Sequence, residues 1–308
     1  MPDFPVGLSV PELECAIDPV RLIKSADETA RSYLNQLDNR RVGLRRLGSR
    51  VAAHAQCAST SLTMSLLALY DGDRTTMLEE CRSLAAEQGQ SLVDVSKEDI
   101  ELAVMDLIIG TDWQRAQRRA PAFFEGRDWR PPSHSGNRII KNPFAQAYTA
   151  SRFARCGDVG VSIASRWVCI ERGLVGPGLN LDQRWEWTRR QWQAGAEVSF
   201  EAAFTDRGHV VHVLEASTKE LVVHDPYGLW LGGTRYIRNG TAAPRMSNRS
   251  AAAFERRSSH NLPLREQRAS GRVFERWGER NLIAKQDLVA INGPAWVLAI
   301  GTGSSAVT

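Results

Sequence analysis

Apolar side chains recur at helical spacing through much of the first two-thirds of the chain. The clearest case is the segment 58–70, in which Leu62, Leu66 and Tyr70 are spaced to lie on one side of a helix that ends at Gly72. Comparable patterns of apolar spacing and helix-starting residues predict further helices over 77–88, 96–109, 143–155 and 181–194. The tryptophans of the last segment do not share one face, so we expect some of them to pack against a neighbouring element.

The pattern changes at residue 197. Short runs rich in β-branched residues cover 197–205, 210–215 and 220–224, and Asp-Arg-Gly and Ser-Thr-Lys turns separate them. Such runs predict successive antiparallel strands, and 295–300 predicts a last strand that closes the sheet. Helices followed by antiparallel strands indicate an α+β fold.

The same pattern divides the chain into a main domain and less regular parts. Residues 1–32 lack clear periodicity and are expected to form an N-terminal extension, 33–300 the main domain, and 301–308 a tail. A basic insertion, 237–272, interrupts the domain. The stretch from Arg235 to Arg272 contains nine arginines and only two glutamates. A solvated loop is the simpler interpretation of this arm, and an acidic partner is the alternative. Few aromatics are interleaved with the arginines, which disfavours single-stranded nucleic acid.

Composition indicates the size of the core, the kinds of partner and the cellular compartment to expect. The 308 residues are 43% hydrophobic and carry a net charge of +4, enough to build a substantial core without implying nucleic acid. No long uncharged apolar run predicts a membrane span, and the first residues lack the basic and apolar regions of a signal peptide. We therefore expect synthesis in the cytoplasm. Work elsewhere would need a non-classical route such as export or packaging in a virion.

The five cysteines do not look like a disulfide framework or a metal site. They lie at 15, 57, 81, 156 and 169, with no Cys-x-x-Cys pair and no histidine-rich run beside them. An odd number of irregularly spaced cysteines favours reduced thiols, and we expect no metal and no cofactor. Four of them are expected to be small buried hydrophobes.

Cys57 is the exception, because it stands at the head of the strongest predicted helix. A helix N-terminus and a paired imidazole both favour the thiolate, the form in which cysteine is a nucleophile. His209 and Asp225 follow about 150 residues later on adjacent predicted strands, where they could complete a Cys-His-Asp triad. His212 and His224 are the alternative bases. Alternation along a strand predicts that the rings of His209 and His212 point to opposite faces.

Four motifs in order resemble papain-like family 39 cysteine peptidases and their bacterial and phage relatives. They are Asn-Gln-Leu-Asp-Asn at 35–39, Cys-Ala-Ser-Thr-Ser-Leu-Thr-Met at 57–64, Gly-His at 208–209, and Asp-Pro-Tyr-Gly at 225–228. Two positions depart from the family pattern, in which Gly often stands at Ala58 and Asn at His224. These 308 residues contain no transporter segment, so we do not expect a transporter-linked leader peptidase.

The resemblance implies a papain-like fold, with the catalytic cysteine at a helix N-terminus packed on an antiparallel sheet. It makes Cys57 the nucleophile, His209 the general base and acid, Asp225 its orienting carboxylate, and Gln36 a donor to the oxyanion, with Gln56 as the rival donor. Two more residues are expected at the substrate cleft. Gly208 leaves room beside the thiol, and Trp230 follows the Asp-Pro-Tyr-Gly turn.

The implied activity is thiol hydrolysis of a peptide or isopeptide bond, in a peptide or peptidoglycan-type substrate. Transfer of the acyl group to an amine, as in transglutaminase-like relatives, would use the same triad. A catalytically inactive binding module on the same scaffold is the third interpretation. No membrane partner is expected.

Overall fold

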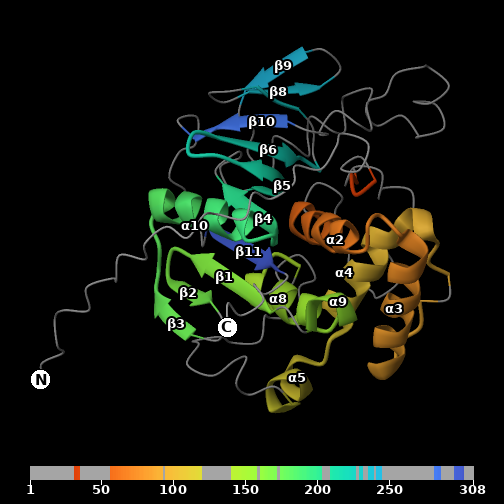
Figure 1. Ribbon diagram of the computed structural model, residues 1–308. Coiled ribbons are helices and arrows are strands. Elements are labelled where there is room, and N and C mark those ends of the chain that lie inside the picture. The colour runs from red at the N-terminus through yellow and green to blue at the C-terminus, as the bar shows by residue number, and fades with distance from the viewer. Residues whose placement is uncertain are drawn as a thin grey trace, which may run out of the picture.

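A mixed assembly of helices and antiparallel strands accounts for the described part of the chain (Figure 1). The computed structural model describes residues 31–34, 56–92, 94–119, 140–157, 160–171, 174–202, 209–226, 229–231, 235–238, 241–244, 281–285 and 295–301. The predicted α+β class is confirmed by this architecture.

The largest element is an eight-stranded antiparallel sheet in the order β10-β6-β5-β4-β11-β1-β2-β3. Its strands are β1 (Val161–Ser165), β2 (Val168–Glu171), β3 (Leu174–Pro177), β4 (Glu197–Ala202), β5 (His209–Ala216), β6 (Glu220–His224), β10 (Asn281–Ala284) and β11 (Trp296–Ile300). The last strand of the chain is inserted between β4 and β1, so it joins two parts of the sheet that are distant in sequence.

Helices cover both faces of this sheet. The helices of the described chain, some of which pack on other helices and not on the sheet, are α2 (Cys57–Leu69), α3 (Arg74–Glu87), η3 (Lys97–Asp99), α4 (Ile100–Gly110), α5 (Trp113–Arg119), α8 (Pro143–Ser151), α9 (Ala154–Gly157) and α10 (Leu181–Gln193). Side chains of α2, α3, α4 and α8 form one core with Trp296, Leu298 and Ile300 of β11. The opposite face of β11, with Val297 and Ala299, packs against α10. The alternation of side chains along each strand supplies both faces.

Local signals fix the ends of several helices. Asp73 accepts hydrogen bonds from the backbone of Thr75 and Thr76 at the start of α3. Asn142 caps α8, and Asn180 forms a capping box with Gln183 at the start of α10. Among the described residues no helix is both long and apolar enough to cross a membrane.

The tryptophans of α10 show why they need not share one face. Each buries its ring and donates from Nε1 to a different element. Trp185 donates to the Ser217 carbonyl at 2.9 Å, Trp187 to a Glu171 carboxylate oxygen at 3.0 Å, and Trp192 to the Leu214 carbonyl at 2.6 Å. The expectation that some of them contact neighbouring elements is confirmed.

The strands β1 to β3 and β10 were not predicted. In the sequence, α10 follows β3 and precedes β4, so the helices do not all come before the strands. The helix predicted over 143–155 is divided into α8 and α9. The arm predicted as a loop contains, in its described part, β8 (Arg235–Arg238) and β9 (Thr241–Pro244). These two pair with β7 (Leu229–Leu231) in a small antiparallel sheet. The rest of the arm, 239–240 and 245–272, lies outside the described residues.

Candidate active site

Helix α2 is the central helix, and its side chains from Cys57 to Leu67 are buried on all sides. Its contact with β5 includes polar side chains as well as apolar ones. Cys57, Ser61 and Ser65 stand four residues apart, a spacing that places them on one side of a helix. The N–H of Val210 in β5 donates to the Cys57 sulfur, and Ser61 Oγ donates to the Val210 carbonyl at 2.9 Å. These two bonds fix the start of α2 beside the start of β5 (Figure 1).

His209 is the first residue of β5, and Asp225 directly follows β6. The two side chains are 4% and 1% exposed, and His209 Nε2 lies 2.7 Å from Asp225 Oδ1. The ring also hydrogen-bonds the Cys57 thiol. Because Asp225 occupies Nε2, Nδ1 is the nitrogen that serves the sulfur.

Electrostatics favour an ion pair between these groups. Burial disfavours the charged imidazolium, but the negative charges of Asp225 and Cys57 and the hydrogen bonds with both outweigh it and raise the pKa of His209 to about 10. Burial likewise opposes the thiolate. The charge of His209, the hydrogen bond with it, the Lys141 charge and the Val210 N–H together lower the pKa of Cys57.

The other described cysteines behave in the opposite way. Burial is the main cause that raises the pKa of Cys81, of Cys156 to about 12, and of Cys169. Cys57 is therefore the one cysteine, among the four that the structure describes, whose surroundings favour the thiolate. A lowered thiol pKa beside a partner imidazole is the chemical mark of a nucleophilic cysteine.

The two strand histidines reach α2 at different points. His212 Nδ1 lies 2.9 Å from Ser65 Oγ, so this ring also contacts α2, eight residues along the helix from Cys57. Alternation separates side chains within a strand, but His209 is the strand's first residue, where its ring reaches the start of the helix. About 12 Å of helix separate the two contacts, which leaves the Cys57 thiol to His209.

His212 belongs to a second buried polar cluster. Ser65 Oγ lies 3.0 Å from Ser199 Oγ, and His212 Nε2 lies 3.6 Å from a Glu197 carboxylate oxygen. The fully buried His224 places its ring 6.0 Å from that of His212 and 5.2 Å from that of Tyr33. His224 thus packs within the core, although it directly precedes Asp225.

Two charged residues near Cys57 were not predicted. Glu201 of β4 is buried, and its carboxyl lies within electrostatic range of the Cys57 sulfur. Lys141, just before α8, acts on both groups. The alternation of Glu197, Ser199 and Glu201 with Val198 and Phe200 was the available signal, because it marks one polar face of a buried strand.

Most of the remaining predicted site residues fall beyond the part of the chain that the structure describes. Gln36 and Gly208 lie outside the described residues, and so does the side chain of Trp230, although its backbone belongs to β7. The rival donor, Gln56, is buried at the N-cap of α2. The oxyanion donor and the two cleft residues stay predictions.

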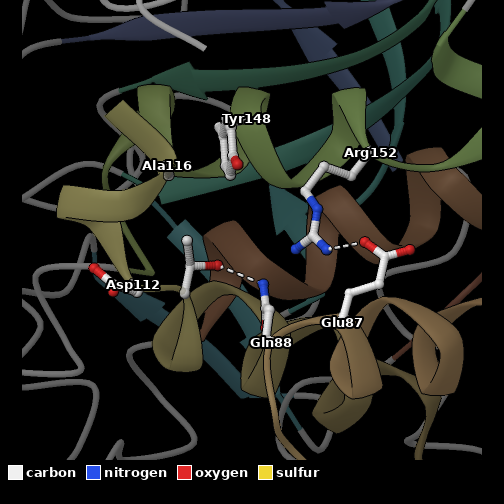
Figure 2. Close-up of a pocket in the computed structure, with 7 residues that line it drawn as sticks. Glu87, Gln88, Asp112, Ala116, Tyr148 and Arg152 are labelled. Carbon is white, nitrogen blue, oxygen red and sulfur yellow. Dashed lines mark hydrogen bonds and ion pairs between the residues drawn. The ribbon is translucent and has the colours of Figure 1, made fainter. Parts of the chain in front are cut away.

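A separate polar cleft lies among α3, α4, α5 and α8 (Figure 2). Arg152 points across it to Glu87 at 3.0 Å, and Gln88 donates to Thr111 at 2.9 Å. None of Cys57, His209 or Asp225 lines this cleft. In the part of the chain that the structure describes, no three His, Cys, Asp or Glu residues are grouped to hold a metal ion.

Comparisons with known proteins add no relative. No protein-family model, no curated protein and no solved structure matches this chain.

Proposed function

We propose that this chain is a thiol hydrolase that cleaves a peptide or isopeptide bond through a thioester on Cys57. The observation that carries the proposal is the buried chain of contacts from Cys57 to His209 and from His209 to Asp225. A helix start that meets an antiparallel sheet at the nucleophile, together with the four motifs in order, also supports the finer assignment to a papain-like fold.

Acylation begins from the ion pair. The Cys57 thiolate attacks the substrate carbonyl carbon, and the carbonyl electron pair moves onto oxygen to give a tetrahedral oxyanion. The oxyanion collapses, the C–N bond breaks, and the proton on His209 Nδ1 passes to the departing amine. The acyl group is left on Cys57 as a thioester, and His209 is left neutral. The Asp225 carboxylate holds the ring by its Nε2 throughout.

Deacylation uses the same groups in reverse. Neutral His209 takes a proton from water through Nδ1, and the resulting hydroxide adds to the thioester carbonyl. The C–S bond then breaks, the acid product leaves, and the thiolate and imidazolium are restored. The backbone N–H of Cys57 in the first turn of α2 is suited to stabilise both oxyanions, because it has no partner within the helix. The predicted second donor is Gln36.

The proposal is tested by trapping the acyl-enzyme. The protein is incubated with a mixture of peptides and peptidoglycan fragments, quenched in acid, and searched by mass spectrometry for an acyl mass on Cys57. We expect a hydroxylamine-sensitive adduct on Cys57 and released amine products, both lost in Cys57→Ala. Cys81→Ala is the matched control, because Cys81 is buried with a raised pKa. Substrate cleavage that persists in Cys57→Ala would refute the thiol mechanism.

A further inference from the structure

Glu201 lies directly beside the start of the Cys57 helix. In the register of β4 and β5 it pairs with Val210, the residue that bonds Cys57 through its N–H and Ser61 through its carbonyl. Ser199, two residues earlier on β4, contacts Ser65 of α2. Side chains two residues apart on a strand share a face, so Glu201 also points to the α2 side. The carboxyl therefore lies on the side of the sheet that carries the Cys57 helix, and the two groups interact electrostatically.

The Glu201 side chain is buried with little to stabilise a charge. The residue is 9% exposed, and one oxygen accepts a hydrogen bond from the Trp296 N–H at 3.2 Å. Among the described residues no lysine or arginine forms an ion pair with it within 4.0 Å. The preceding Ala295 has a φ of 36°, a left-handed value that is unusual for alanine and lies at the point where the Trp296 N–H meets Glu201.

Three charged groups from different parts of the chain act on Glu201. Cys57 of α2 opposes its ionisation, whereas Lys141 before α8 and Arg184 of α10 favour it at longer range. His209, the partner of Cys57, lies across from Ala202, the next residue on β4. Burial is the largest influence on Glu201, and it raises the pKa of the carboxyl to about 8 against the opposing effect of the Trp296 N–H.

We propose that Glu201 is a positioning residue for Cys57, which holds its proton in the working enzyme and so keeps a second negative charge away from the thiolate. The inference rests on the proposed function, because it assumes that Cys57 reacts as a thiolate. While Glu201 is neutral, the positive charge of Lys141, which acts on both Cys57 and Glu201, favours an anionic group beside the scissile bond. When Glu201 ionises, it offsets Lys141 and repels both an anionic substrate group and the developing oxyanion.

The test compares two alkylating reagents that differ in charge. Rate constants for labelling Cys57 are measured at low salt from pH 6 to 9.5, once with iodoacetate, an anion, and once with neutral iodoacetamide. Both reagents attack the same thiolate, so the ratio of their rates cancels the thiolate fraction and reports the charge beside the sulfur. We expect the ratio of the iodoacetate rate to the iodoacetamide rate to fall about three- to tenfold as pH rises through about 8. This is the size of effect expected for one nearby charge.

Glu201→Gln keeps the shape of the side chain and removes the titrating proton, so its ratio should stay level. Glu197→Gln is the matched control, because Glu197 lies on the same face of β4, about 13 Å further along the strand, and should behave as the wild type. A level ratio in the wild type, which needs no variant to fold, would overturn the inference, as would a fall that persists in Glu201→Gln. Absence of selective Cys57 labelling at pH 6 would instead remove the thiolate, and the proposed function with it.

Discussion

His209 donates from Nε2 to Asp225 Oδ1 at 2.7 Å, and both side chains are almost fully buried. This bond fixes the tautomer and orientation of the ring, because only Nδ1 is then left to face Cys57. The geometry has a direct chemical consequence. A buried carboxylate at the far nitrogen stabilises the imidazolium, and the imidazolium in turn stabilises the thiolate.

Replacing Asp225 with Asn should weaken the stabilisation of the imidazolium and the thiolate, while the side chain keeps nearly the same shape and volume. The charge of Asp225 is the main cause that raises the pKa of His209 against burial, so its loss should shift the pKa of the ring down and that of Cys57 up. We expect iodoacetamide labelling of Cys57 to slow at least tenfold at pH 6 and to approach the wild-type rate near pH 9.5. An unchanged pH profile would show that Asp225 has a structural role only.

The two strand histidines should respond differently to substitution. His209→Ala removes the partner of the thiol, so selective labelling of Cys57 at neutral pH should be lost. His212→Gln should retain it, because that ring contacts Ser65 eight residues further along the helix. The second variant should nevertheless lower the free energy of unfolding by about 1–3 kcal/mol, since it disturbs a buried hydrogen bond. The reverse result in the labelling assay would make His212 the base.

Ser61 offers a test of how the helix is held. Its hydroxyl donates to the Val210 carbonyl at 2.9 Å and ties α2 to β5 next to Cys57. Ser61→Ala should lower the free energy of unfolding by about 1 kcal/mol and also slow Cys57 labelling, because the thiol loses its fixed position. Thr63→Val is the control. Thr63 donates to Ser59 within the same helix, so this variant should change stability without slowing the labelling.

Glu201 also makes a prediction about stability and pH. Its pKa in the folded protein, about 8, is higher than that of an exposed glutamate, so the folded state binds its proton more tightly than the unfolded state does. Stability from this group is present at low pH and is lost as pH rises from about 4.5 to 8, with a slope of up to about 1.4 kcal/mol per pH unit.

Denaturant unfolding of the wild type and of Glu201→Gln at several pH values checks the predicted pH dependence of stability. The difference between their free energies of unfolding should change across pH 5 to 8 in favour of the glutamine variant. Contributions from Cys57 and His209 are common to both proteins and largely cancel. A constant difference across that range would contradict a buried, proton-bearing Glu201.

Elements with a strong local pattern could be predicted closely from the sequence. The run predicted over 220–224 is β6, and the helix predicted over 181–194 is α10, which begins at its Asn180 cap. The strands β1 to β3 were missed because they are short and lie toward one edge of the sheet. Leu174 in β3 is 76% exposed, so the alternation of buried and exposed residues that marks a strand is weak there.

The site was only partly accessible to sequence reasoning. A cysteine at a helix start and a histidine and an aspartate at strand ends have local signals, and the structure brings Cys57, His209 and Asp225 together. The contact of Ser61 with Val210 joins residues 149 apart, and the place of Glu201 depends on strand register. Neither has a local signal, because both arise only when the helix packs on the sheet.

The most direct measurement of the central claim is brief alkylation at pH 6, followed by mass-spectrometric mapping of every cysteine. The account predicts selective labelling of Cys57, because its pKa is lowered while those of Cys81, Cys156 and Cys169 are raised. Its labelling should also fall away in His209→Ala. Equal labelling of several cysteines, or no labelling of Cys57, would contradict an activated thiolate and leave a scaffold without thiol catalysis.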